Sequence, residues 1–193
     1  MGIETYIERN FGGKKGLLRL FWFHSLDFLT RRYSRYRNIP SGTKRLVFVC
    51  KGNICRSALA EHYFRSISSF PTTSIGLDTH TGKPANDRVL SETQHLSIRL
   101  STHKTTAVED FTWQPGDLFV CMEPSNITLL KRHIGDQPTI LLGLYGDPQR
   151  IYVHDPYNAK LSYLRFCNSY IICSVESLNK KLIENNQIVI ENT

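Results

Sequence analysis

A short apolar run that leads into a loop and then a helix constrains this chain more than any other stretch. Residues 46–49 (LVFV) precede the octapeptide CKGNICRS at 50–57, and residues that favour a helix begin at Ala58. The first N–H groups of a helix are free and lie at the positive end of its dipole, so a strand, loop and helix in this order form an anion site. The stretch therefore predicts an α/β domain with an anion-binding loop after its first strand.

The rest of the domain alternates short apolar runs with helical patterns. We expect strands at 45–50, 73–77, 117–122 and 139–144, and helices at 57–68, 86–97, 125–133 and 161–184. Such alternation is typical of a parallel sheet of four strands flanked by helices, in which ligands bind beyond the carboxyl ends of the strands. With 40% apolar and 21% charged residues among 193, the chain can bury a core of that size.

The N-terminal segment differs from the rest in charge. Residues 1–45 hold ten Lys and Arg against three acidic residues, and this difference of seven equals the net charge of the whole chain, +7. Residues 1–15 predict an irregular start with a break at Gly12-Gly13, residues 16–37 predict a helix, and residues 39–42 (IPSG) predict a linker. We therefore divide the chain into a basic, amphipathic helical arm (1–44) and a main domain (45–193).

Three roles for the arm follow from its composition. The helix at 16–37 can dock on the domain or on a second copy of the chain, which would bury Phe21, Trp22, Phe23, Phe28 and Leu29. It can instead lie on an anionic lipid surface or a partner, as a peripheral membrane helix does. Nucleic-acid binding is the least favoured role, because the basic cluster is short and no recognisable module accompanies it.

Cysteine usage and the apolar runs bear on location. The five cysteines are odd in number and form no CxxC pair, which argues against a disulfide framework and favours a reducing compartment. No run approaches the roughly 20 apolar residues needed to cross a bilayer. We expect a cytoplasmic protein. We also expect no metal and no other cofactor, because His62, His95 and His133 lack partners at ligand spacing.

Cys50 and Arg56 make the anion loop a candidate reaction centre. The thiolate is the nucleophilic form of cysteine, and free N–H groups, a helix N-terminus and a guanidinium all favour that form. Arg56 offers a planar fork for two phosphate oxygens. Gly52 allows the turn that directs N–H groups inward, Asn53 can hold the loop, and Ser57 can assist the departing thiolate. Attack on phosphorus would give a phosphocysteine that water hydrolyses.

Cleavage of a phosphate ester also needs a group that protonates the leaving oxygen. Asp155, in the sequence HDPY at 154–157, follows the last expected strand and so lies at the same end of the sheet as Cys50. Pro156 restricts its backbone, and Tyr157 could line the cleft and stack on an aromatic substrate. Asp147-Pro148 is a second Asp-Pro pair, and spacing does not decide between Asp147 and Asp155.

Four segments together resemble a known family. CKGNICRS, SIGLDTHTGKPAND (74–87), DLFVCMEPSN (117–126) and HDPY occur in the order and at the spacings of low-molecular-weight protein tyrosine phosphatases of bacterial type, over about residues 45–182. The resemblance implies phosphotyrosine hydrolysis with Cys50 as nucleophile, Arg56 as phosphate binder and Asp155 as general acid and base. It implies, as partner, a phosphotyrosine protein such as a bacterial tyrosine kinase that controls exopolysaccharide export.

The resemblance also implies roles around the loop. It places Asn53, Ser57, Ser74 and His103 in a hydrogen-bond network that supports the loop. It makes Cys55 the second loop cysteine, which can form a reversible disulfide with the nucleophile. The residues expected to contact the phosphate or the substrate are Lys51, Gly52, Asn53, Ile54, Cys55, Ser57, His80 and Tyr157.

Departures from the family pattern suggest a substrate preference and leave two rival functions. Lys51 stands where an apolar residue is usual and His80 lies on the opposite wall, so we expect acidic phosphopeptides or small anionic phosphoesters to be preferred. An arsenate reductase on the same fold would need a pair of cysteines near residues 100–115, where this chain has none. A catalytically silent phosphate-binding scaffold is the other rival, and the intact set of Cys50, Arg56 and Asp155 argues against it.

Overall fold

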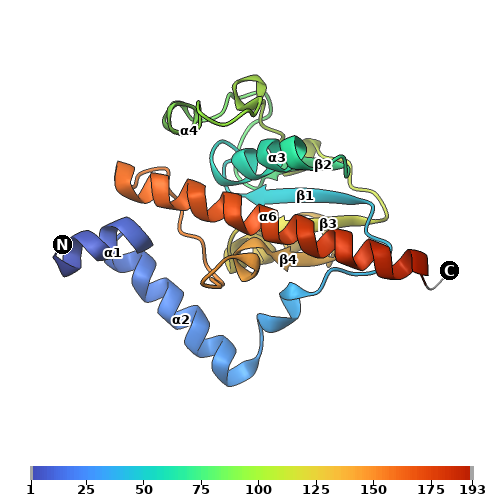
Figure 1. The fold of residues 1–193 in the computed structure, drawn as a ribbon, viewed down its shortest axis with the longest axis horizontal. Coiled ribbons are helices and arrows are strands. Elements are labelled where there is room, and N and C mark those ends of the chain that lie inside the picture. Colours follow the sequence, from blue (N-terminus) through green and yellow to red (C-terminus); the bar gives the residue numbers. More distant parts are fainter. Residues whose placement is uncertain (1, 192–193) are drawn as a thin grey trace.

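A parallel sheet of four strands lies at the centre of the molecule (Figure 1). The structure is a computed structural model that describes the backbone of residues 2–191 and the side chains of residues 2–185. The strands lie in the order β2-β1-β3-β4. Their bounds are β1 Arg45–Cys50, β2 Thr72–Gly76, β3 Asp117–Cys121 and β4 Thr139–Leu141. The prediction of a four-stranded parallel sheet flanked by helices is confirmed.

Helices cover both faces of the sheet because alternate strand residues point to opposite sides. Phe48 and Val120 face α3 (Arg56–Ile67) and α6 (Leu161–Glu191), which pack together on one face and form the larger core. Val49 and Cys121 face the other side, with α5 (Pro124–Ile134). Figure 1 shows α6 running across the sheet, and β1 pointing its carboxyl end toward the start of α3.

Two elements are shorter than the sequence predicts. The helix expected at 86–97 is α4, Asp87–Glu92, capped by the Asn86 side chain and followed by turns that start at Thr93. The strand expected at 139–144 ends at Leu141 and continues as a 3₁₀ turn, Leu142–Tyr145. Gly143 lies in this turn because the carbonyl of Arg150 passes so close that a Cβ at Gly143 would lie 2.1 Å from the carbonyl oxygen.

The arm contains more helix than predicted. Residues 3–11 form α1 (Ile3–Phe11) rather than an irregular start, and Gly12, with φ of 71°, ends it where the break was expected. α2 runs over Lys14–Thr30 and not to residue 37, because the Asp27 carboxylate accepts the backbone N–H groups of Tyr33 and Ser34 and holds a 3₁₀ turn, Ser34–Arg37. Each helix within residues 2–191 is too short or too polar to cross a membrane.

The arm packs against the main domain through one side only. Tyr33 is buried in the core on the α5 side of the sheet, and Phe23 packs beside it with ring centroids 5.6 Å apart. Docking on the domain leaves Phe21, Trp22, Phe28 and Leu29 largely exposed, so the expectation that the domain buries them is wrong. Their burial against a second copy of the chain stays a prediction. The apolar residues of α2 therefore divide between an inner face that contacts the domain and an outer face that does not.

Candidate active site

Cys50 lies at the carboxyl end of β1, at the floor of a cavity of about 480 Å³. The loop 51–55 turns over it, and α3 begins at Arg56. The cavity is lined by Cys50, Lys51, Gly52, Ile54, Cys55, Arg56, Asp78, His154, Asp155, Tyr157 and Asn158. The loop after the first strand thus lies where the sequence predicted, at the edge where ligands of parallel sheets bind.

Asn53, rather than Gly52, adopts the unusual backbone conformation of the loop. Its φ of 53° lies in the left-handed region, which Asn tolerates better than most residues, whereas Gly52 has a negative φ and room for a side chain. The turn that we assigned to Gly52 is therefore made by Asn53. The backbone N–H of Asn53 donates to Cys50 Sγ over 3.2 Å, so this turn aims a donor at the sulfur.

The Asn53 side chain connects the loop to β2 and to the segment after residue 103. Its Oδ1 accepts the backbone N–H of Thr106 at 2.9 Å, and this contact fixes the orientation of the amide. Its Nδ2 therefore donates to Ser57 Oγ at 2.9 Å and to Ser74 Oγ at 2.7 Å. Because Ser57 Oγ accepts from Asn53, its own proton is available to Cys50 Sγ, which lies 3.0 Å away. The sulfur thus has two donors, an arrangement that stabilises negative charge on it.

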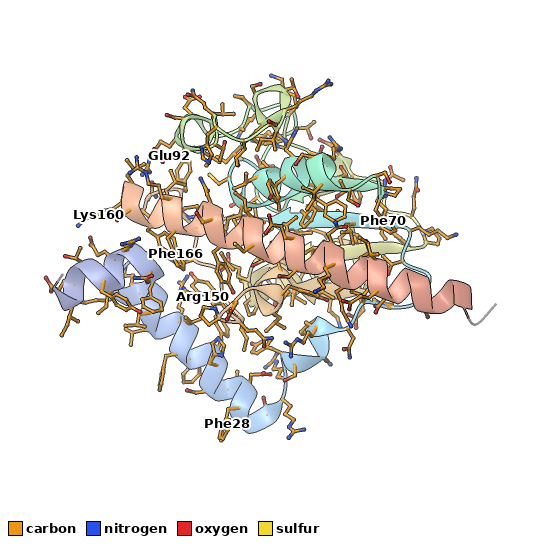
Figure 2. The ribbon with its side chains drawn as sticks, in the orientation of Figure 1. Phe28, Phe70, Glu92, Arg150, Lys160 and Phe166 are labelled. Carbon is orange, nitrogen blue, oxygen red and sulfur yellow. The ribbon has the colours of Figure 1, made fainter. Side chains whose placement is uncertain are left out.

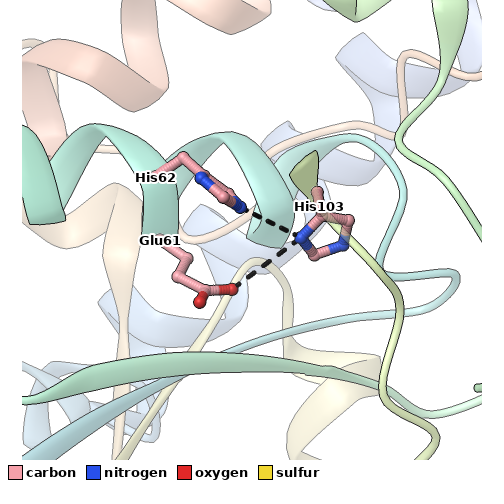
Figure 3. Close-up of side chains that lie close together, drawn as sticks. All are labelled: Glu61, His62 and His103. Carbon is pink, nitrogen blue, oxygen red and sulfur yellow. Dashed lines mark hydrogen bonds and ion pairs between the residues drawn. The ribbon is translucent and has the colours of Figure 1, made fainter. Parts of the chain in front are cut away.

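A buried trio beneath the loop completes this support (Figure 3). His103 Nε2 donates to the backbone carbonyl of Asn53 over 2.7 Å, so its Nδ1 faces His62 Nε2 at 3.3 Å and Glu61 Oε2 at 4.0 Å. Burial lowers the pKa of both histidines, that of His62 to about 4, and raises the pKa of Glu61. The neutral His103 ring can then accept from His62.

This trio is also a group that could hold a metal ion. One ligand atom from each of Glu61, His62 and His103 lies within 4.8 Å of the others. The sequence pattern showed no partner for His62 because His103 is 41 residues away and reaches it only in the folded chain. Each of these atoms already has a protein contact: His62 Nε2 and His103 Nδ1 contact each other, and Glu61 Oε2 accepts from Ser74 Oγ. The trio therefore supports the loop, through the bond from His103 to the backbone of Asn53.

Arg56 is buried, and three acceptors from two other loops surround its guanidinium. Nη1 donates to Glu123 Oε1 at 3.1 Å and to the carbonyl of Val153 at 2.9 Å, while Nη2 donates to Asp155 Oδ2 at 2.6 Å. Burial acts to lower the pKa of Arg56, but the charges of Glu123 and Asp155 outweigh it and raise the pKa, so the guanidinium stays charged. Arg56 Nε has no hydrogen-bond partner among the described side chains and backbone groups.

Asp155 and Tyr157 line the cavity across from Cys50, whereas Asp147 does not. The Asp155 side chain is partly exposed, at 38%, and Oδ1 accepts the backbone N–H of Tyr157 at 3.1 Å while Oδ2 accepts from Arg56. Tyr157 is half exposed at the mouth of the cavity. Of the two Asp-Pro pairs, the one at 155–156 is therefore the one beside the loop.

The rim differs from the expected basic pair. His80 is exposed and does not line the cavity, whereas Asp78 does. Lys51 lies at the rim as expected, and its Nζ lies 3.3 Å from Asp78 Oδ2. Because His80 does not line the cavity and Lys51 pairs with a carboxylate, the structure does not support the predicted preference for acidic substrates.

Cys55 lies in the cavity wall with Cys50, and all five cysteines of the chain are free. Burial and the neighbouring Cys50 raise the pKa of the Cys55 thiol well above its usual value. Cys55 therefore stays a thiol near neutral pH, and Cys50 is the thiol with donors aimed at it.

The arm contacts the segment that carries Asp155. Arg19 Nη1 donates to Tyr152 Oη at 3.1 Å, so the Tyr152 hydroxyl proton is available to His154 Nδ1 at 2.7 Å. Gly12 lies against the same His154 ring, where a Cβ would come within 2.3 Å of Cδ2. The sequence pattern did not indicate this contact, because the arm and the HDPY segment lie about 140 residues apart in the chain and meet only in the fold.

Arg150 anchors the arm a second time (Figure 2). Its Nη1 donates to the carbonyl of Asn10 at 2.7 Å, and its guanidinium lies 5.0 Å from the ring of Phe11 and 4.7 Å from that of Phe166. A cation between two aromatic rings stabilises both contacts. α1 is thereby joined to α6 next to the HDPY segment.

Two residues of the site carried a sequence signal that we did not use. Glu123 follows β3, which lies beside β1, so its position at the same sheet edge follows from the strand order expected for this fold. Gly76 ends β2, where a Cβ would lie 3.0 Å from Asn53 Cβ and 3.1 Å from the Gly52 carbonyl carbon. The missing side chain lets the loop approach the sheet.

Comparison with known proteins agrees with this geometry. A sequence model of the family "Low molecular weight phosphotyrosine protein phosphatase" matches residues 45–188. A pig protein of that name is 31% identical over 129 residues, which cover 60% of this chain and 80% of the relative. A probable low molecular weight protein-tyrosine-phosphatase of Ralstonia nicotianae, EpsP, is 26% identical over 121 residues (62% and 82%).

Solved structures share the fold at lower identity. The tyrosine phosphatase AmsI of Erwinia amylovora superposes with a TM-score of 0.63 at 21% identity, covering 72% of this chain and 93% of its own. The arginine phosphatase YwlE of Geobacillus stearothermophilus gives 0.63 at 17% identity (75% and 96%). With its loop, sheet and family match, the chain belongs to the low molecular weight phosphotyrosine protein phosphatase family.

Proposed function

We propose that this chain hydrolyses phosphotyrosine in proteins, and small aryl phosphates, through a phosphocysteine intermediate. The observation that carries the proposal is that Cys50, Arg56 and Asp155, three residues from two distant segments, line one cavity. A nucleophile, an anion binder and a proton donor are the groups that this chemistry needs.

Arg56 is the group that would bind the phosphate. Glu123 and Val153 hold Nη1, so the edge formed by Nε and Nη2 remains for two phosphate oxygens. In the structure, Asp155 occupies Nη2. An arriving phosphate would take over that donor and leave the Asp155 carboxyl near the leaving oxygen.

The steps then follow from the contacts. Cys50 attacks phosphorus as the thiolate, the bond to the tyrosyl oxygen breaks, and the protonated Asp155 carboxyl gives that oxygen its proton. The Asp155 carboxylate then takes a proton from water as the water attacks the phosphocysteine. The sulfur leaves as a thiolate, and Ser57 Oγ, 3.0 Å away, donates to it.

Turnover of p-nitrophenyl phosphate and of a phosphotyrosine peptide tests the proposal. Cys50→Ser should abolish turnover, and Asp155→Asn should lower kcat by about 10²–10⁴-fold, the usual contribution of general acid–base catalysis. Matched controls are Cys173→Ser, an exposed cysteine outside the cavity, and Asp147→Asn, the other Asp-Pro pair; both should retain wild-type turnover. Full activity of Cys50→Ser would refute the mechanism.

The substrate is tested with a second peptide. YwlE, a structural neighbour, is described as an arginine phosphatase, so a phosphoarginine peptide of the same sequence is the informative comparison. We expect the phosphotyrosine peptide to have the higher kcat/KM, because Tyr157 offers an aromatic surface at the cavity mouth. The reverse ranking would assign the site to phosphoarginine. A bacterial tyrosine kinase as partner and a cytoplasmic location remain predictions.

A further inference from the structure

Helix α2 presents a largely apolar face to solvent. Its residues are Leu18, Phe21, Trp22, Phe28 and Leu29, which are between 66% and 88% exposed. At 3.6 residues per turn these five lie within an arc of about 120° of the helix. Figure 2 shows Phe28, the most exposed of them, pointing away from the rest of the molecule. Isolated exposed apolar residues are ordinary, but a face of five large ones marks an interaction surface.

This outer face has a fixed direction because the inner face of α2 is attached to the domain. Phe23 and Leu26 pack on the core beneath Tyr33, and Arg19 bonds to Tyr152. The helix is therefore not a loose segment whose apolar residues happen to be exposed. It holds its outer residues on one side of the folded protein.

Basic side chains flank both ends of the outer face. Lys14 and Lys15 begin the helix, and Arg31 and Arg32 follow its last residue; all four are exposed. The one acidic residue of α2, Asp27, is engaged with the backbone of Tyr33 and Ser34. A bilayer that contains anionic lipid is negatively charged at its surface and apolar beneath. Apolar residues flanked by cations complement such a surface.

We propose that the outer face of α2 lies in the headgroup region of an anionic lipid bilayer and holds the protein at the membrane surface. With 17 residues and its inner face attached to the domain, the helix lies on the bilayer and does not span it. A second copy of the chain fits the face less well, because a symmetric pair through α2 would bring the basic ends of both helices together.

The experiment uses Trp22 as a reporter in the full chain. The protein has two tryptophans, so Trp113→Phe leaves Trp22 as the source of tryptophan fluorescence. Vesicles of phosphatidylcholine with phosphatidylglycerol should shift its emission to the blue and sediment the protein, and high salt should weaken binding. Vesicles of phosphatidylcholine alone should bind much less. No shift and no sedimentation with the anionic vesicles would overturn the proposal.

Variants separate the apolar and the charged contributions. Phe21→Ser with Phe28→Ser should weaken vesicle binding by roughly a factor of a hundred, since each buried phenyl ring contributes about a factor of ten or more. The matched control is Trp113→Ser, an exposed aromatic residue outside the arm, which should bind as the wild type does. Wild-type binding by the double Phe variant would contradict the assigned face.

Neutralising the flanking charges should also weaken binding to anionic vesicles. Lys15→Gln with Arg31→Gln should weaken binding, whereas Arg132→Gln with Lys180→Gln, exposed residues outside the arm, should change it much less. An equal loss in both pairs would show a response to net charge alone and overturn the assignment to α2.

Two further measurements separate lipid binding from self-association and from catalysis. Sedimentation velocity without lipid tests whether two copies of the chain associate through α2. If the protein is a dimer that Phe28→Ser dissociates, and if it does not bind vesicles, self-association would replace our proposal. Cys50→Ser should bind vesicles as tightly as the wild type. Because lipid binding and turnover are measured separately, failure of either proposal leaves the other standing.

Discussion

Replacing Asn53 by alanine should both destabilise the protein and slow its reaction. The side chain is fully buried and makes three hydrogen bonds, to Ser57, Ser74 and the backbone of Thr106. At about 1 kcal/mol each, their loss costs about 3 kcal/mol. Alanine in the left-handed conformation adds about 1 kcal/mol. We therefore expect Asn53→Ala to lower the free energy of unfolding by about 4 kcal/mol.

Asn53→Gly separates the two contributions. Glycine loses the same three hydrogen bonds but adopts a φ of 53° without strain. Its free energy of unfolding should therefore lie about 1 kcal/mol above that of Asn53→Ala. Equilibrium urea unfolding followed by circular dichroism measures all three proteins. Asn38→Ala, at an exposed asparagine, is the matched control and should unfold as the wild type does.

The effect on turnover follows from the same contacts. Without Asn53 Nδ2, Ser57 Oγ is no longer held 3.0 Å from Cys50 Sγ. A small displacement of a catalytic group can cost about 10²-fold in rate, and we expect a fall in kcat of about that size. The reasoning is refuted if Asn53→Ala stays within about 1 kcal/mol of the wild type, or if Asn53→Gly is the less stable of the two.

Two other substitutions test the arm contact and the buried trio. Gly12→Ala should lower the free energy of unfolding by about 1–3 kcal/mol more than Gly42→Ala does, because both glycines have positive φ but only the Cβ at Gly12 would overlap the His154 ring. The kcat of Gly12→Ala should fall as well. Equal stability of the two variants in urea unfolding would contradict the contact. Burial lowers the pKa of His62 to about 4, so its contribution to stability is complete above its unfolded pKa near 6.5 and is lost as the pH falls toward 4. His62→Gln should therefore lose less stability than the wild type between about pH 7 and pH 5, and an unchanged loss would show that His62 does not titrate in this way.

Local pattern predicted the parts of the fold that depend on neighbours in the sequence. The four strands and the helix after Cys50 were found because apolar runs and helix-forming stretches are local signals. α1 was missed although its sequence carried a helical signal, because we did not use the spacing i, i+3, i+4 and i+8 of its apolar residues, Ile3, Tyr6, Ile7 and Phe11. The truncation of β4 depends on the approach of Arg150 to Gly143, which no local pattern encodes.

The features of the active site likewise fall into those that the sequence determined and those that only the fold decided. The sequence by itself determined the loop, its cysteine and its arginine, because a strand, a loop and a helix in succession place those groups together whatever surrounds them. Tertiary structure decided which Asp-Pro pair faces the loop, that Asp78 rather than His80 lies at the rim, and that His62 meets His103. It also decided which apolar residues of α2 are buried and which face outward. These outcomes depend on distances between segments remote in the chain, and packing of the whole chain sets those distances.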